Sequence, residues 1–289
     1  VLAYVQPDGS WMLNNTGAIV GRSGVVLIDT TSTEARNRAL LAAVGERVGG
    51  LPVRAAVNTH HHGDHTYGNC LLPAGIPIVA HHRCREEVLR AGLVAQALFP
   101  TADYGGIQVT PPTVTFERSL TLHVDDTRVE LVFVGPAHTL GDVIAWLPDR
   151  RVVFTGDLVF HGAHPFLAEG CLANFPSALE LLRELGAEVL VPGHGPLAGA
   201  DVLEGMLDYA EWLATLARDG FAAGQEPLEV ARRADLDRFA TWGERERLVG
   251  NLARAYSELR GEPWGSPLDL PAIAQDMIAF NGGPLRCLA

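Results

Sequence analysis

Lysine is absent from this chain of 289 residues, so arginine supplies all 22 of its basic side chains. A chain without lysine cannot form an iminium ion with a carbonyl substrate, and it has neither a P-loop lysine nor a Ser–Lys dyad. Its 34 acidic residues give a formal net charge of −12, which would repel a phosphate backbone. Nucleic acid is therefore not an expected partner.

Cysteines and long apolar runs are also scarce. The 4 cysteines show no CxxC spacing and are too few for a disulfide framework, which favours reduced thiols and a cytoplasmic location. No stretch approaches the roughly 20 apolar residues of a membrane span, so no membrane partner is expected. Because the chain begins with Val1, a leader that has already been removed stays an open alternative.

The apolar residues that are present form short runs closed by turns. Residues 16–30 read as a strand, a turn and a strand, and residues 142–160 repeat this format, which suits two similar sheets packed face to face. Residues 32–50 have helical spacing. Beyond residue 200 helical spacing dominates. We expect a catalytic domain over 1–200 and a helical extension over 201–289 packed on it, which either covers a pocket or forms a homodimer interface.

Histidine and aspartate concentrate in residues 58–69, "NTHHHGDHTYGN". His60 and His62 alternate as a strand ends, so they can point the same way, while Asp64 and His65 turn toward a second point. Zinc prefers imidazole nitrogen and carboxylate oxygen, so one loop could supply halves of two metal sites. A histidine-rich surface loop is the plain alternative.

Further candidate ligands lie far along the chain. His138, Asp157 and His194 each follow an apolar, strand-like run and stand close to a glycine. Taken singly, each is more often an ordinary turn or loop residue. Together with the histidine-rich stretch they favour a metal site, because residues at strand ends can converge at one edge of a sheet.

These motifs resemble, in order, the five motifs of the metallo-β-lactamase-fold superfamily over residues 12 to about 200, beginning with Asp29. The resemblance implies an α/β fold, an αββα sandwich, that holds two Zn²⁺ ions per chain. It implies that one ion is held by His60, His62 and His138 and the other by Asp64, His65 and His194. It also implies that Asp157 bridges the two ions and that Asp29 orients the ligand loop. β-Lactamases generally carry Cys or Ser in place of Asp157, and flavo-diiron relatives carry Glu in place of His62, which favours the thioesterases and lactonases.

Residues outside the metal motifs, in 103–124, 129–139, 231–236 and 280–289, are similar to a narrower group. This group comprises the zinc-dependent second-ring cyclase/thioesterases of actinorhodin-type aromatic polyketide pathways. The resemblance implies an intramolecular aldol condensation and hydrolysis of a carrier-protein thioester, with an aromatic polyketide intermediate and an acyl carrier protein as partners. Because lysine is absent, zinc would have to stabilise the enolate. Asp64 or Asp157 would accept the proton released during hydrolysis.

The segment 160–174 follows Asp157 and is expected to lie over the metals. Its candidates for substrate contact are His161, His164, Phe166 and Asn174. Tyr67 and Tyr104 could donate to a phenolate or enolate oxygen, although a buried tyrosine commonly satisfies its hydroxyl within the fold. An acidic carrier protein would need an arginine patch, either Arg83, Arg85 and Arg90 or Arg232 and Arg233.

Two other functions stay open. A general hydrolase of the same fold would act on a lactone, a β-lactam or a glutathione thioester, as lactonases, β-lactamases and glyoxalase II-like thioesterases do. A scaffold within a synthase complex would need no catalytic metal. The complete set of expected ligands speaks against the scaffold, because degenerate members of such families usually lose ligands.

Overall fold

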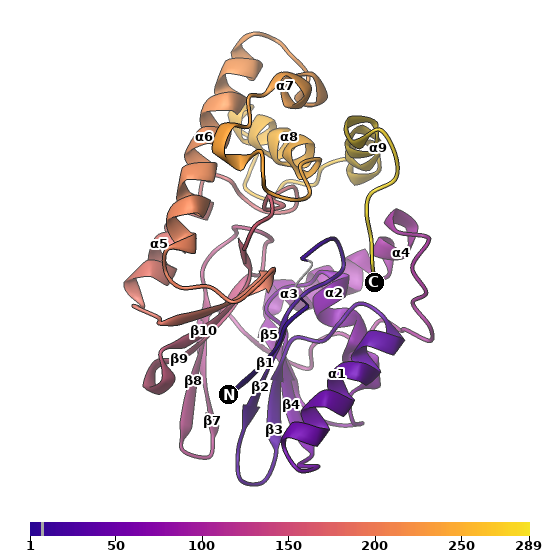
Figure 1. Ribbon diagram of the computed structural model, residues 1–289, viewed down its shortest axis with the longest axis vertical. Coiled ribbons are helices and arrows are strands. Elements are labelled where there is room, and N and C mark those ends of the chain that lie inside the picture. Colours follow the sequence, from indigo (N-terminus) through magenta and orange to yellow (C-terminus); the bar gives the residue numbers. More distant parts are fainter. Residues whose placement is uncertain (7–8) are drawn as a thin grey trace.

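Two β-sheets pack face to face in the computed structural model, which describes residues 1–6 and 9–289 (Figure 1). Helices cover the outer faces of the sheets, and further helices stand at one end. This arrangement confirms the expected α/β sandwich. The described helices include none that is long and apolar enough to cross a bilayer.

The first sheet has 6 strands in chain order, with its central strands parallel. They are β1 (Leu2–Tyr4), β2 (Thr16–Val20), β3 (Val25–Ile28), β4 (Val53–Val57), β5 (Ile78–His81) and β6 (Val114–Phe116). The second sheet has 5 strands in the order β11-β10-β9-β8-β7, and β10 and β11 are parallel. They are β7 (Ser119–Val124), β8 (Thr127–Phe133), β9 (Val143–Leu147), β10 (Val152–Phe160) and β11 (Val189–His194).

The space between the sheets is filled by alternating apolar side chains, including Ile28 from β3, Leu131 from β8 and Phe154 from β10. β9 and β10 are buried on both faces, because helices cover the side that faces away from the first sheet. This double burial explains why these two strands read as continuous apolar runs rather than as an alternating pattern.

Helix α1 (Glu34–Arg47) covers the outer face of the first sheet. It begins after Thr33, whose hydroxyl accepts a hydrogen bond from the amide of Arg36 at 3.3 Å, and it buries Leu40 and Val44 against the sheet. Short helices follow the later strands of this sheet: α2 (Gly63–Thr66), η1 (Tyr67–Leu71), α3 (His82–Ala91) and α4 (Val94–Leu98).

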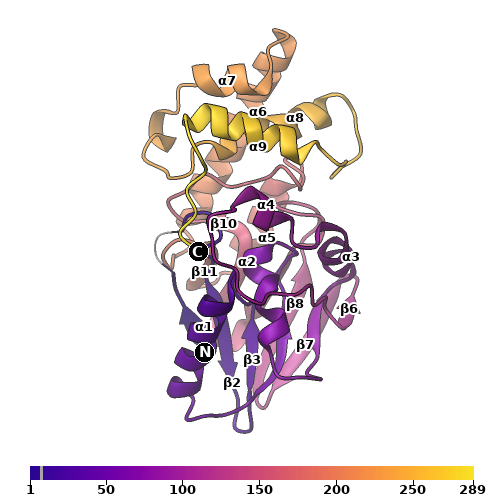
Figure 2. The ribbon, with the colours of Figure 1, turned by 90° about the vertical axis from the view of Figure 1, so that its right-hand side faces the viewer.

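A group of helices stands above the end of the sandwich (Figure 2). Helix α5 (Phe175–Glu184) lies on the second sheet, and the chain after residue 201 forms α6 (Val202–Ala222), α7 (Pro227–Arg233), η3 (Asp237–Phe239), α8 (Arg247–Leu259) and α9 (Leu270–Asn281). Leu203 of α6 and Leu252 of α8 share one hydrophobic cluster with Leu179 of α5 and Ile144 of β9. The helices after residue 201 therefore extend the core of the second sheet.

Candidate metal centre

Asp29 and the loop after β4 together build the floor of the site. Thr59 donates to both carboxylate oxygens of Asp29, from its amide and from its hydroxyl, each at 2.7 Å. Nδ1 of His65 lies 2.8 Å from Oδ2 of the same carboxylate. Asp29 thus ties both ends of the ligand loop to the end of β3. Asn58 adds a hydrogen bond from its amide group to the carbonyl of His65 at 2.9 Å.

Two glycines allow β10, β11 and the loop after β4 to approach one another closely. Gly156 has φ +52°, and a Cβ at this position would lie 2.7 Å from the hydroxyl oxygen of Thr59. A Cβ on Gly193 would lie 1.8 Å from Oδ1 of Asp157. Close approach of β10, β11 and the loop after β4 therefore requires glycine at both positions.

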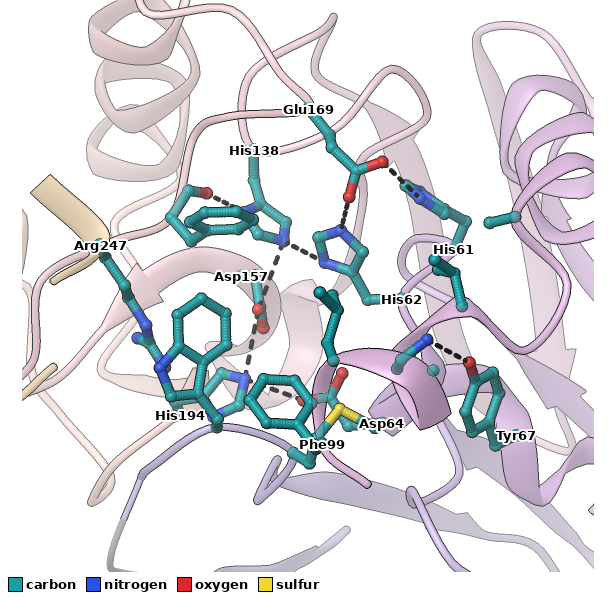
Figure 3. Close-up of a pocket in the computed structure, with 18 of the residues that line it drawn as sticks. His61, His62, Asp64, Tyr67, Phe99, His138, Asp157, Glu169, His194 and Arg247 are labelled. Atoms are coloured by element: carbon teal, nitrogen blue, oxygen red, sulfur yellow. Dashed lines mark hydrogen bonds and ion pairs between the residues drawn. The ribbon is translucent and has the colours of Figure 1, made fainter. Parts of the chain in front are cut away.

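The first group of candidate ligands comprises His60, His62, His138 and Asp157, whose ligand atoms lie within 4.8 Å of one another. Nε2 of His138 lies 2.9 Å from Nδ1 of His62 and 3.4 Å from Oδ2 of Asp157 (Figure 3). Nε2 of His60 lies 3.8 Å from the same oxygen. These ligand atoms come from both sheets and converge on one point.

The second group comprises Asp64, His65 and His194. Nε2 of His194 lies 3.2 Å from Oδ2 of Asp64, and Nε2 of His65 lies 3.8 Å from it. Asp157 approaches this group too, because its Oδ1 lies 3.1 Å from Nε2 of His65 and its Oδ2 lies 3.2 Å from Nε2 of His194. The carboxylate of Asp157 therefore stands between the two groups.

Both groups fit a pair of metal ions. Nε2 of His60 and Nε2 of His65 are buried and make no hydrogen bond. Such orphaned polar atoms are unfavourable in a protein interior, and a bound cation would satisfy them. The second ring nitrogen is already engaged in two of the ligands, because Nδ1 of His65 contacts the carboxylate of Asp29 and Nδ1 of His138 contacts the carbonyl of Phe166. Imidazole and carboxylate are the donors that zinc prefers.

The protonation states of His60, His138 and Asp157 suit metal binding, whereas neighbouring carboxylates outweigh burial and raise the pKa of His62, His65 and His194. Burial, followed by the charges of neighbouring imidazoles, holds the pKa of His60 well below its usual value. Burial likewise lowers the pKa of His138 to about 3. Burial alone would raise the pKa of Asp157, but His194 and His65 outweigh it and hold that pKa well below its usual value. Neutral imidazoles and ionised carboxylates are the forms that coordinate metals.

Glu169 is a residue of this site that the sequence did not indicate. Its Oε2 lies 2.9 Å from Nε2 of His62, and its Oε1 lies 3.6 Å from Nε2 of His61. Burial would raise the pKa of Glu169, but hydrogen bonds from His61 and His62 hold it well below its usual range. A single glutamate in an apolar loop carries no spacing pattern. Only the folded loop brings it to the histidines.

A pocket opens over the two ligand groups. Its walls carry Trp11, Phe99 and Phe166, and its floor includes Asp64 and Asp157. Among the expected substrate contacts, Phe166 and Tyr67 line this pocket. The hydroxyl of Tyr67 accepts a hydrogen bond from the amide of Ala95 at 3.2 Å, and burial raises its pKa to about 12.

The other expected substrate contacts, Tyr104, His161, His164 and Asn174, are not among the residues that line this pocket. His164 is buried, and its ring nitrogens lie 3.2 Å from the hydroxyl of Tyr209 and from the carbonyl of Phe239. The hydroxyl of Tyr104 donates to the carbonyl of Ala95 at 3.1 Å. The imidazole of His161 contacts the carbonyl of Pro196, and the side-chain amide of Asn174 donates to the carbonyl of Pro136. Both side chains therefore have hydrogen-bond partners within the fold.

Residues 9–194 match the family model of the metallo-beta-lactamase superfamily. The chain is also 27% identical over 247 residues to the alpha subunit of 2,4-dinitroanisole O-demethylase of Nocardioides sp. (strain JS1661), covering 84% of this chain and 70% of the relative. It is 30% identical over 142 residues to hydroxyacylglutathione hydrolase of Thermosynechococcus vestitus. That match covers 49% of each chain.

A solved structure shares the architecture. The metallo-beta-lactamase from Pontibacter korlensis superposes with a TM-score of 0.56 and 25% sequence identity, covering 68% of this chain and 87% of that chain. The family match ends at residue 194, so it includes the whole candidate metal centre but not α8, which contributes Arg247 to the pocket wall.

Proposed function

The chain belongs to the metallo-beta-lactamase superfamily, and on that premise we propose that it is a dinuclear zinc hydrolase of acyl thioesters or esters with an apolar, planar acyl group. The observation that carries this proposal is the pocket, because aromatic rings line it together with candidate ligands of both groups. Members of this superfamily are mostly metal-dependent hydrolases, and the hydroxyacylglutathione hydrolases are relatives of this chain.

Each of the two ligand groups would hold one metal ion. His60, His62 and His138 would hold one zinc ion, Asp64, His65 and His194 would hold the other, and Asp157 would contact both. When bound, such ions lower the pKa of water and polarise a carbonyl group. Either Asp64 or Asp157 can take up the proton that the attacking water releases, because both carboxylates line the pocket and are ionised.

The apolar wall of the pocket would bind the acyl group of the substrate. Trp11, Phe99 and Phe166 offer faces on which a planar acyl group can stack, and they exclude water around the scissile bond. Rings of Trp11 and Phe166 meet edge to face with centroids 5.1 Å apart, so the two side chains support each other in this wall. Binding of a flat acyl group therefore needs little rearrangement.

An aromatic polyketide cyclase/thioesterase is the second candidate, and one observation favours it. Two of the segments that resemble those enzymes meet in the cluster behind Phe99, because Leu285 and Cys287 of the tail share this hydrophobic cluster with Tyr104. The relatives named above have other activities, so this narrower function rests on the segments and on the aromatic pocket. It would add an aldol ring closure to the thioester hydrolysis.

Substrate comparison tests both candidates. The zinc-loaded protein would be offered a naphthoyl thioester, a small lactone, a glutathione thioester and a chromogenic cephalosporin. We expect kcat/KM for the naphthoyl thioester to exceed the others at least tenfold, because only this acyl group fills the aromatic wall. Preference for the cephalosporin or the lactone would overturn the proposal.

A second experiment separates the two candidates. Incubation with a minimal polyketide synthase that supplies a first-ring-cyclised, carrier-bound intermediate would be followed by mass spectrometry of the released products. A bicyclic product supports the cyclase/thioesterase, whereas release without a second ring supports a plain thioesterase.

A further inference from the structure

Arg247 enters the pocket from a part of the chain that the family match does not include. It is the first residue of α8, whereas the match ends at residue 194. Its side chain lines the pocket together with Asp64, Asp157 and His194 (Figure 3). The residue is 1% exposed, which is unusual for an arginine.

Two aromatic rings lie close to this guanidinium. Its central carbon lies 4.3 Å from the ring centroid of Trp11 and 4.9 Å from that of Phe160. Stacking of this kind fixes the plane of the group and leaves only the in-plane N–H donors for hydrogen bonds. Arg247 is thus held in one orientation before any ligand arrives.

One of its nitrogens is unpaired. Nη1 donates to the carbonyl of His164 at 2.9 Å, whereas Nε is buried and makes no hydrogen bond. No ion pair joins Arg247 to a carboxylate within the described part of the chain. Glu246, its neighbour in sequence, accepts a hydrogen bond from the indole of Trp11 at 2.7 Å. Asp64 and Asp157 belong to the metal-ligand groups.

The carboxylates of Glu244 and Glu246 act on the charge of Arg247 without forming an ion pair with it. A buried cation that lacks a directly bonded counter-ion is unfavourable, so its presence in a pocket needs a reason. Guanidinium recognises anionic oxygens better than any other side chain, because its fork of N–H groups matches their geometry. Once cations occupy the ligand groups, Asp64 and Asp157 are neutralised, and the pocket then attracts negative charge.

We propose that Arg247 is the anion-recognition residue of the pocket and that it binds an anionic oxygen, a carboxylate or an ionised phenol or enol, on the acyl group of the substrate. The inference rests on the proposed function and narrows it. The preferred acyl group is planar and negatively charged, with its anionic oxygen at Arg247 and its carbonyl at the metal-ligand groups.

Matched substrates and variants test this assignment. The substrates would be two naphthoyl thioesters that differ only in a carboxylate on the ring. The variants would be Arg247→Met and Arg247→Lys. The control would be Arg245→Met, which removes an exposed arginine two residues earlier. For Arg247→Met we expect KM of the carboxylate-bearing thioester to rise about 10- to 100-fold, while KM of the neutral thioester changes less than about threefold. Arg247→Lys should be intermediate, because ammonium keeps the charge but not the fork.

A readout without turnover separates this proposal from the proposed function. Calorimetric titration with 2-naphthoate measures anion binding even if no thioester is hydrolysed, and we expect it to weaken in Arg247→Met but not in Arg245→Met. Equal losses for the charged and the neutral ligand would mean that Arg247 only packs the pocket wall, and would overturn the proposal. If Arg247→Met failed to fold, Arg247→Lys would be used instead. An unchanged preference of Arg247→Lys for the carboxylate-bearing over the neutral thioester would also overturn the proposal.

Discussion

Glu169 contacts the candidate metal centre through the imidazole of His62. Because its carboxylate lies 2.9 Å from Nε2 of His62, it favours the tautomer that carries a proton on Nε2 and leaves Nδ1 free to bind a metal. A carboxylate in this position also fixes the plane of the ring. Metal binding would therefore depend on a residue that belongs to neither of the two proposed ligand sets.

Substitution of Glu169 by alanine should weaken metal binding about 10- to 100-fold, because His62 loses the partner that orients it. Competition with a chromogenic chelator measures this affinity directly. Glu169→Gln should lose less, since the amide oxygen can still accept the hydrogen bond. An unchanged affinity in Glu169→Ala would show that His62 needs no such partner.

Removal of the imidazole of His164 should reduce stability without changing substrate binding. His164→Phe leaves the carbonyl of Phe239 without its partner, so we expect the free energy of unfolding to fall by about 1–3 kcal/mol. Urea unfolding and steady-state kinetics would measure both effects. A raised KM with normal stability would instead restore His164 as a substrate contact.

Residue chemistry and position at strand ends could predict the ligand groups, because parallel strands deliver their ends to one edge of a sheet. The residues that the sequence did not indicate reach the pocket by another route. Trp11, Glu169 and Arg247 come from loops and from a distant helix, and no periodic pattern marks them. Their placement depends on tertiary packing, which the spacing of residues along a chain does not encode locally.

One face of α8 holds the loop over the metal centre. The side chain of Asn251 donates to the carbonyl of Pro165 at 2.8 Å and accepts from the amide of Leu167 at 2.7 Å. Arg254 donates twice to the carbonyl of Ala168, at 3.0 Å and 2.7 Å. These residues lie on one face because their spacing is close to a helical turn. The helix was expected from its periodicity, but its polar contacts were not.

Asn251→Ala should release this loop. The amide of Leu167 and the carbonyl of Pro165 would lose their partners in a buried setting, so we expect a loss of about 1–3 kcal/mol in unfolding free energy. Hydrogen exchange at Leu167 should become faster. The matched control is Leu259→Ala on the same helix, where the side chain is 40% exposed. Unchanged exchange at Leu167 would argue against a role for α8 in holding the loop.

At the scale of the whole molecule, the proposed metals bind the folded chain but not the unfolded one, so they should stabilise it. At a free zinc concentration about 1,000 times the dissociation constant, each site would contribute about 4 kcal/mol. We therefore expect a chelator to lower Tm by several degrees and zinc to restore it, as measured by scanning calorimetry. Metal analysis should give two zinc ions per chain. A Tm that does not respond to zinc would contradict a structural contribution from the metals.

The ligand loop after β4 belongs to the first sheet, whereas Asp157 and His194 lie in strands of the second. Neither sheet alone can assemble a complete group, and His194 is the last of these residues to be synthesised. During translation the second group therefore stays incomplete until β11 has left the ribosome and the two sheets have docked. Capture of zinc by this group would mark the moment at which the sandwich closes.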